Sequence, residues 1–182
     1  MANRFRNKID SNYNNKPATK IRWKKSLDFI GDNYSFKNAL DIGDRSGLTA
    51  MMESKYQIKF DNTKGDLDYV RLDGRYDLIT SFEIIEHLFN PLYHLTEVKG
   101  MLSENGKIIL STPLAKPRVL WAKKHFHEMS IKSIKALFEA SGFKIIRQEI
   151  FRVHPFIFYF SGVRPLLRLL YDKIQIYELS HC

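Results

Sequence analysis

The sequence predicts an α/β protein in which helices cover both faces of a mostly parallel sheet. Short apolar runs alternate with helical patterns along most of the 182 residues, and this alternation favours parallel strands joined by helical crossovers. Asn38–Gly47 (NALDIGDRSG) has the form of a strand, a glycine turn and the start of a helix. Thr80–Leu88 (TSFEIIEHL) places two carboxylates and an imidazole just after another strand, where open α/β sheets hold their ligands.

The first half of the chain is expected to contain two helices and three strands. Trp23, Leu27 and Ile30 lie on one apolar face, which predicts a helix over 21–32. A second helix should follow the glycine turn, over 46–56. The predicted strands are 37–42, 57–60 and 76–82, with Asp61 directly after the second of them. Residues 62–75 are interpreted as loop, because glycine, asparagine and charged residues interrupt them.

The second half continues the alternation. Pro91 is expected to begin a helix that Asn105 and Gly106 end, and Ser130 should cap a helix that closes at Gly142. The other expected elements are a helix over 165–172 and strands over 107–112, 143–153 and 173–179. We expect a single domain over 1–182, with 1–20 a basic, disordered leader and 154–172 an apolar insertion before the last strand.

The formal charge of +9 is concentrated at the start of the chain. Residues 1–25 carry eight lysines and arginines against Asp10 alone, so a phosphate backbone or an anionic membrane is an alternative to a solvated leader. Cys182 is the only cysteine, which excludes an intrachain disulfide and a cysteine-based zinc site. No apolar segment of the kind found in secretory signals stands near the N-terminus, and we expect a cytoplasmic protein.

Several segments, in order, resemble the class I S-adenosylmethionine-dependent methyltransferases, small-molecule branch, from Ala39 to Val153. They are ALDIGDRSG, KFDNT, YDLITSFEIIEHL followed by NP, MLSENGKIILSTP and HFHEMSIKSIKALFEASGF. The resemblance implies a Rossmann-like three-layer sandwich whose last strand, 173–179, is antiparallel. It also implies S-adenosyl-L-methionine as the cofactor. Residues 62–75 are too few for the helix, strand and loop usual there, so the fold should be shortened after the second strand.

The resemblance also implies roles for the residues at the strand ends. Gly43 and Gly47 would let the backbone approach the donor's amino-acid tail, and Asp41 would organise that turn. Asp61 would bind the ribose hydroxyls, with Asp66 as the alternative acid. The next strand end would line the pocket near the methionine portion with Ser81, Phe82 and Glu83.

One residue of the glycine turn departs from the family pattern. Arg45 stands where the family usually has its middle glycine. Its side chain would crowd the donor, strain the backbone, or swing out to contact the donor's carboxylate. A degenerate domain that does not catalyse methyl transfer is therefore one alternative.

The acceptor side is expected to use histidine. Transfer to oxygen needs a base, and His125 and His127 follow the strand over 107–112, where substrate loops gather. We expect these two residues to contact the substrate without a metal. An alternative rests on the metal centre of the small-RNA 2′-O-methyltransferases, which has a similar pattern. In that case four residues would bind magnesium or manganese: Glu83, Glu86, His87 and His125.

The predicted function is methyl transfer to an oxygen, or a nitrogen, of a small molecule or glycan precursor. A metal-assisted methyltransferase acting on RNA is the second hypothesis. Residues 154–170 are unusually apolar and aromatic but carry Arg164 and Arg168, so they make a poor membrane span. They are predicted to pack on the core or form a dimer contact, or alternatively to touch a membrane surface beside a lipid-linked substrate.

Overall fold

The computed structural model describes residues 15–32 and 34–182 and contains one six-stranded sheet. The order across the sheet is β2-β1-β3-β4-β6-β5. The strands are β1 (Ala39–Asp41), β2 (Phe60–Asn62), β3 (Tyr76–Phe82), β4 (Leu102–Pro113), β5 (Phe143–Arg152) and β6 (Lys173–His181). β6 runs antiparallel to both of its neighbours, and the other pairs are parallel. This confirms the mostly parallel sheet with an antiparallel last strand.

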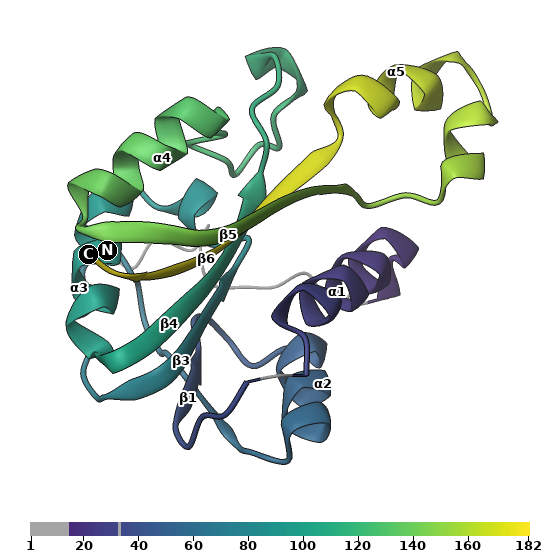
Figure 1. Ribbon diagram of the computed structural model, residues 1–182. Coiled ribbons are helices and arrows are strands. Elements are labelled where there is room, and N and C mark those ends of the chain that lie inside the picture. Colours follow the sequence, from purple (N-terminus) through teal and green to yellow (C-terminus); the bar gives the residue numbers. More distant parts are fainter. Residues whose placement is uncertain (1–14, 33) are drawn as a thin grey trace.

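Helices cover both faces of this sheet (Figure 1). α1 (Pro17–Ile30) and α2 (Gly47–Tyr56) lie on one face, and α3 (Pro91–Met101) and α4 (Ile131–Ala140) lie on the other. A separate apolar core fills each side. Leu78 and Ile109 point toward α1 and α2, while Ile79 and Ile108 point toward α3 and α4. The alternation along the central strands therefore produces the predicted three-layer sandwich.

Several predicted boundaries are confirmed by their caps. The Ser46 and Ser130 side chains accept hydrogen bonds from the third backbone N–H of α2 and of α4, and Asn90 does the same for α3. Residues 62–75 hold no helix, and no strand lies between Asn62 and Tyr76, as the shortened fold requires. The bounds of β5 and β6 also agree with prediction to within two residues.

Several boundaries differ from prediction, among them the start of β4, which is Leu102 and not residue 107. α1 begins at Pro17, inside the expected leader, whose residues 1–14 lie outside the described part. β2 begins at Phe60, because Gln57 adopts a left-handed conformation (φ 54°) that ends α2 and leaves 58–59 as a connection. α3 ends at Met101, before Asn105 and Gly106, because β4 already begins at Leu102.

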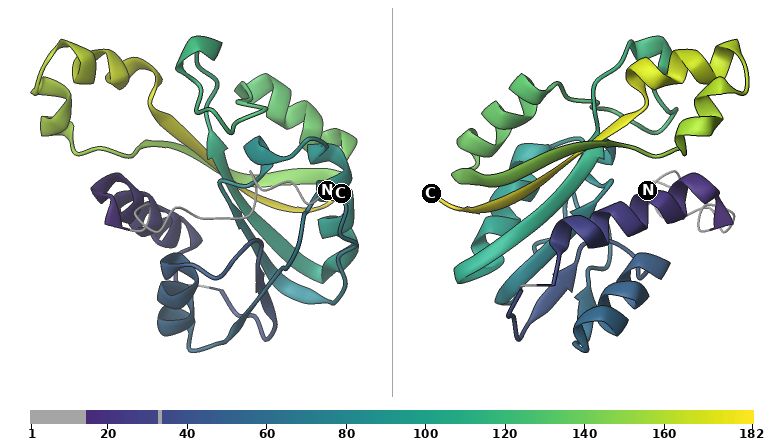
Figure 2. Two further views of the ribbon diagram at one scale, coloured as in Figure 1. Left: turned by 180° about the vertical axis from the view of Figure 1, so that it is seen from behind. Right: turned by 45° about the vertical axis from the view of Figure 1, so that its right-hand side comes forward.

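The apolar insertion forms an arm that extends beyond the sheet (Figure 2). It contains the short helix η4 (Phe156–Phe160) and α5 (Val163–Tyr171), between β5 and β6. His154 stacks on Phe158 with ring centroids 4.0 Å apart, and its Nε2 lies 3.4 Å from the Asp172 carboxylate. These contacts join the start of the arm, at His154, to its end, at Asp172. Among the described helices, none has the length and apolar character needed to cross a bilayer.

Candidate active site

Asp41, the last residue of β1, organises the glycine turn. The residue is 5% exposed, and its carboxylate accepts hydrogen bonds from Thr49 Oγ1 at 2.5 Å and Thr80 Oγ1 at 2.7 Å. Thr49 belongs to α2 and Thr80 to β3. One carboxylate therefore joins three elements at the carboxyl edge of the sheet. The predicted organising role of Asp41 fits this arrangement.

Burial makes ionisation of this carboxyl costly. It raises the pKa of Asp41 to about 6, although the hydrogen bonds from Thr49, Thr80 and Asn62 lower it in part. Charge in a low-dielectric site is disfavoured unless donors or cations compensate it. A positive charge near the turn would therefore favour the ionised form of Asp41.

Gly43 and Gly47 serve different purposes. Gly43 has φ 102°, which side chains rarely adopt, and its N–H donates to Thr63 Oγ1 at 2.7 Å. The Asn62 amide donates to the carbonyls of Asp41 and Gly43 from the end of β2. A Cβ on Gly47 would lie 2.6 Å from the Trp23 ring. Gly47 is thus required first by packing against α1, a reason that the sequence did not reveal.

Arg45 does not obstruct the turn. Its φ is not positive, and its guanidinium forms a paired contact with the Glu53 carboxylate on α2, with Nη1 2.9 Å from Oε1. Glu53 Oε1 also accepts the Phe60 N–H. The hydrogen bond from Arg45 is the main reason that the pKa of Glu53 falls to about 2. The expected backbone strain is therefore absent, and the side chain is directed to Glu53 on α2.

Glu83 occupies the turn after β3 in a strained conformation, with φ 58°. Its carboxylate binds Arg22 Nη1 at 2.8 Å and Ser111 Oγ at 3.0 Å. The side chains of Arg22 and Glu83 are only 17% and 12% exposed. Non-glycine residues in this region of φ are concentrated at ligand sites. The structure thus places a sheltered pair of opposite charges beside the glycine turn.

Ser81 and Phe82 lie on opposite faces of β3. Ser81 is fully buried, and its hydroxyl has no hydrogen-bond partner among the described residues. Phe82 is half-buried against the core under α1 and α2. Successive side chains of a strand point to opposite faces of the sheet, so Ser81 and Phe82 cannot both face the same pocket.

The two candidate acids for the ribose lie at different edges of the sheet. Asp61 is paired with Leu40 in the middle of β2, and its carboxylate accepts the Tyr76 hydroxyl at 3.1 Å. It lines a shallow hollow with Lys37 and Arg75 at the amino ends of the strands. The predicted position of Asp61 after the strand is therefore wrong, because β2 begins later than expected.

Asp66 lies at the other edge, near the segment that follows β3. Its carboxylate accepts the Asp68 N–H at 3.2 Å. Asp68 in turn accepts the N–H groups of Phe89 and Asn90 at 2.8 Å each. These bonds place the turn that carries Asp66 against the segment leading into α3.

A second cluster gathers after β3 and β4. Glu86 and His87, in the short helix η2 (Ile85–His87), lie beside His125, and their ligand atoms are all within 4.8 Å of one another. The backbone N–H of Phe126 and of His127 donate to the Glu86 carbonyl. The loop 114–129 is thereby bound to η2. Burial, and then the charge of Glu83, raise the pKa of Glu86 well above its ordinary value.

The sequence-predicted acceptor residues therefore separate into two kinds. His125 belongs to the cluster through its side chain, with its Nδ1 2.8 Å from the Glu128 carboxylate. His127 is half-buried and is held near the cluster through its backbone. Five residues that position the site escaped prediction: Arg22, Trp23, Thr49, Thr80 and Asn62. Only Thr49 carried a local signal, since it stands three residues after the cap Ser46 and completes a capping box.

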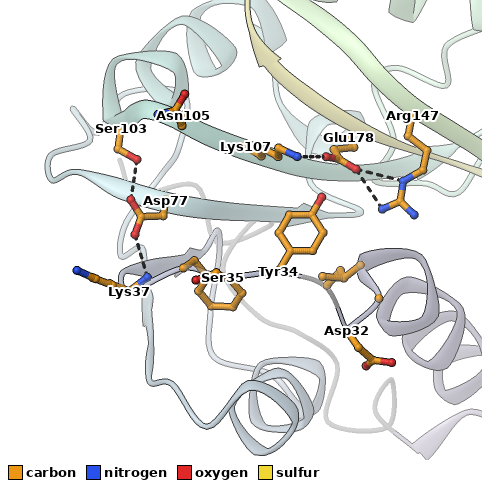
Figure 3. Close-up of a pocket in the computed structure, with 13 residues that line it drawn as sticks. Asp32, Tyr34, Ser35, Lys37, Asp77, Ser103, Asn105, Lys107, Arg147 and Glu178 are labelled. Carbon is orange, nitrogen blue, oxygen red and sulfur yellow. Dashed lines mark hydrogen bonds and ion pairs between the residues drawn. The ribbon is translucent and has the colours of Figure 1, made fainter.

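A pocket of about 760 Å³ lies at the opposite edge of the sheet (Figure 3). Glu178 binds Lys107 Nζ at 2.8 Å and Arg147 Nε at 3.1 Å on its wall. Asp77 accepts the Ser103 hydroxyl at 2.7 Å on the other side. This pocket contains neither the glycine turn nor the histidine cluster. Ligands of open α/β sheets bind at the carboxyl edge, so we place the candidate site there.

Comparison with known proteins identifies the family and the fold of this chain. A family described as a methyltransferase domain (Methyltransf_23) matches residues 18–148. A solved putative methyltransferase from Bacillus halodurans superposes with a TM-score of 0.62 at 12% identity, covering 86% of this chain and 97% of its own. No curated protein sequence matches the chain.

Two further structures have the same fold with different acceptors. The N-methyltransferase NodS from Bradyrhizobium japonicum, in complex with S-adenosyl-L-homocysteine, has a TM-score of 0.63 at 11% identity and covers 94% of this chain and 91% of its own. Mitomycin 7-O-methyltransferase has a TM-score of 0.61 at 14% identity and covers 90% of this chain and 54% of its own. At such low identity the likeness establishes the fold alone.

We predict that Asp41→Asn changes the pH dependence of stability. The folded protein keeps the Asp41 proton up to about pH 6, while the unfolded chain loses it near 4. The wild type should therefore lose stability as pH rises between these values, by up to about 3 kcal/mol at about 1.4 kcal/mol per pKa unit. Urea unfolding from pH 4 to 8 should show the variant gaining relative to the wild type. A constant difference across this range would contradict the buried carboxylate.

We also predict that Gly47→Ala destabilises the fold by about 1–3 kcal/mol, because the new methyl overlaps the Trp23 ring. Gly100→Ala in α3 is the matched control, since a Cβ there meets nothing within 4 Å, and alanine is the better helix former. Adding Trp23→Ala should recover part of the loss. Equal stability of the two glycine variants in denaturant would refute the contact.

Proposed function

Since this chain belongs to the methyltransferase domain family, we propose that it methylates an oxygen, or a nitrogen, of a small molecule or glycan precursor. Its methyl donor is S-adenosyl-L-methionine. This choice of acceptor is supported by two features that lie at the same edge of the sheet. The glycine turn and the Arg22–Glu83 pair stand on one side, and the histidines of loop 114–129 stand on the other.

The donor's amino-acid tail is a zwitterion, and the Arg22–Glu83 pair carries the two complementary charges. The guanidinium would receive the tail's carboxylate, and Glu83 its ammonium. Asp41 supports the same ammonium from beneath the turn, and Gly43 lets the backbone approach. Gly47 acts through the packing of Trp23, and Arg45 stays with Glu53.

Asp66, rather than Asp61, is proposed to bind the ribose. The Asp66 turn lies at the carboxyl edge, against Phe89 and Asn90 through Asp68, whereas Asp61 bonds Tyr76 near the amino edge. Phe82 would support the pocket from within the core. Ser81 is too deeply buried to touch the donor without a change of its neighbours.

Catalysis would rest mainly on positioning. The acceptor oxygen attacks the methyl carbon in line with the carbon–sulfur bond, which breaks to give S-adenosylhomocysteine. The acceptor loses its proton to a base, and we assign this role to His127 or His125. With an oxygen acceptor the product is a methyl ether, and the imidazole passes the proton on to solvent.

The arm suggests that the acceptor is presented at a lipid surface. Seven of its large apolar side chains are 46–80% exposed. They are Phe156, Ile157, Phe160, Val163, Leu166, Leu167 and Leu170. Exposed apolar patches of this kind mark interaction surfaces, and the arm leaves the sheet at the same edge as the glycine turn.

Nearby charges favour an anionic bilayer as the partner. Arg164 is exposed on the arm, and Lys20 and Lys24 are exposed on α1, which lies below the arm in Figure 1. Lys25 of α1 lies 5.5 Å from the Phe151 ring at the end of β5. Basic residues beside an apolar helix attract anionic headgroups, whereas two such arms would repel one another.

We predict that Asp66→Asn weakens binding of S-adenosylhomocysteine by at least about tenfold, because charge-assisted hydrogen bonds to a diol are worth about 1.5–3 kcal/mol. Asp61→Asn is the matched control and should change affinity less than about twofold. Arg45→Ala should also leave it nearly unchanged. Calorimetric titration measures all three. A loss confined to Asp61→Asn would reverse the assignment.

The acceptor class is tested by transfer of a radioactive methyl group from the donor to fractionated cell extracts. We expect label in the small-molecule or lipid-extracted glycan fraction, stable to alkali as a methyl ether is. Replacing His127 by alanine should reduce transfer. Label that appears only in RNA and disappears with ribonuclease would contradict this acceptor class and support the RNA hypothesis.

Membrane contact is tested by sedimentation with vesicles of phosphatidylcholine, with and without phosphatidylglycerol. The full chain should bind only the anionic vesicles and release as salt rises. Ile157→Asp with Leu170→Asp should reduce binding at least about tenfold, while Tyr69→Asp, equally exposed but distant in sequence, should not. A concentration-dependent dimer lost in the arm variants, without vesicle binding, would assign the arm to a second copy.

A further inference from the structure

We propose that the pocket at the amino edge of the sheet binds a small molecule with one anionic group, a phosphate or a carboxylate, and several hydroxyl groups. Its volume of about 760 Å³ falls within the range of about 300–1,000 Å³ that is typical of small-molecule sites. The end of α1 and the segment leading to β1 form one side, and residues of β3, β4, β5 and β6 form the other (Figure 3). The pocket shares no lining residue with the glycine turn or the histidine cluster. The proposal therefore does not rest on the proposed function.

One wall of the pocket carries a surplus positive charge. The Glu178 side chain, only 5% exposed, accepts hydrogen bonds from Lys107 Nζ at 2.8 Å and from Arg147 Nε at 3.1 Å. Although burial raises the pKa of Glu178, the hydrogen bond from Lys107 and the charges of both cations lower it overall. Two cations against one carboxylate leave one positive charge. Both cationic side chains are 39% exposed, so they can also face a ligand.

The same wall retains hydrogen-bond donors. Arg147 Nη2 donates to the Phe29 carbonyl at 2.6 Å, but Nη1 and the remaining hydrogens of Lys107 Nζ make no hydrogen bond within the described part of the chain. The Tyr34 hydroxyl stands beside Glu178 (Figure 3), yet it is buried and has no hydrogen-bond partner among the described residues. Leaving a buried polar group unpaired costs free energy. The oxygens of a bound anion would supply the acceptors that these donors lack.

The opposite wall has a different character. Asp77 accepts the Lys37 N–H at 2.9 Å and the Ser103 hydroxyl at 2.7 Å, and these bonds, led by the first, hold the pKa of Asp77 below its ordinary value. The Lys37 ammonium points away from this carboxylate (Figure 3), so the wall would repel a second anionic group. Ser35 and Asn105 are exposed beside it, and their side chains can both donate to and accept from hydroxyl groups.

The two walls together determine the class of ligand. An anionic group would lie against Lys107 and Arg147, where the surplus charge and the unpaired donors are. The rest of the molecule would meet the exposed hydroxyl and amide of the opposite wall, which match neutral hydroxyl groups. A molecule with an anionic group at both ends would place one of them near Asp77. Glycerol 3-phosphate and glycerate have the expected layout, and glycerol is the same kind of molecule without the charge.

The experiment is an NMR titration of the full chain, labelled with nitrogen-15, with glycerol 3-phosphate, glycerate and glycerol. We expect saturable shifts of the backbone amides of 34–37 and 103–107 with at least one of the two anions, and no comparable shifts of 41–47. Affinity for the anion should fall as salt rises, and glycerol should bind at least about tenfold more weakly. Saturating S-adenosylhomocysteine should leave binding of the anion unchanged.

Two variants test the cationic wall. Lys107→Gln removes one charge and should weaken binding of glycerol 3-phosphate at least about tenfold. Tyr34→Phe removes only the hydroxyl and should weaken it at least about threefold, while the urea midpoint should not fall, because that hydroxyl has no partner to lose. Lys132→Gln is the matched control, since Lys132 is exposed on α4, which covers the other face of the sheet, and its affinity should be that of the wild type.

Three results would overturn the proposal. They are the absence of saturable shifts with both anions, competition between the anion and S-adenosylhomocysteine, and unchanged affinity in both Lys107→Gln and Tyr34→Phe. Failure of S-adenosylhomocysteine to bind would count against the proposed function and not against this pocket, because the two ligands are titrated separately.

Discussion

The edge of the sheet that carries the candidate active site depends on the buried carboxylate of Asp41. Its two hydrogen bonds, to Thr49 and Thr80, join the end of β1 to α2 and β3, and Asn62 holds the same turn from β2. Asp41 and Asn62 together therefore hold the glycine turn against β2, β3 and α2. The cost is a raised pKa, which is the usual consequence of placing charge under a binding site. Because the turn is fixed from below, its exposed surface is available to a ligand.

This constraint also explains why an arginine is tolerated in the turn. With the backbone held by Asp41 and Asn62, the Arg45 side chain extends to Glu53 without a positive φ. Under the proposed function, the edge would have a donor half, with Glu83 and Arg22, and an acceptor half, with the histidine cluster. Glu83 and Glu86 are close in sequence yet belong to different halves. The turn of η2 buries Glu86 and leaves Glu83 with α1.

Local patterns predicted the elements well, because caps, prolines and apolar spacing act within a few residues. Ser46, Pro91 and Ser130 begin their helices as expected. The pairing of Arg22 with Glu83 spans 61 positions, and no local pattern can encode such a contact. Asp61 was misplaced for a local reason that is hard to detect. Gln57 ends α2 in a left-handed conformation, so β2 begins only at Phe60 and Asp61 lies within the strand instead of after it.

The most direct test of this account is a crystal structure of the protein with S-adenosylhomocysteine. We expect the amino-acid tail above the Gly43 turn, with its carboxylate within hydrogen-bonding distance of Arg22 and its ammonium near Glu83, and Arg45 still bound to Glu53. The Asp41 carboxylate should keep both threonine hydroxyls. Density for the nucleoside in the pocket beside Lys107 and Glu178, or an Arg45 side chain folded over an empty glycine turn, would contradict the account.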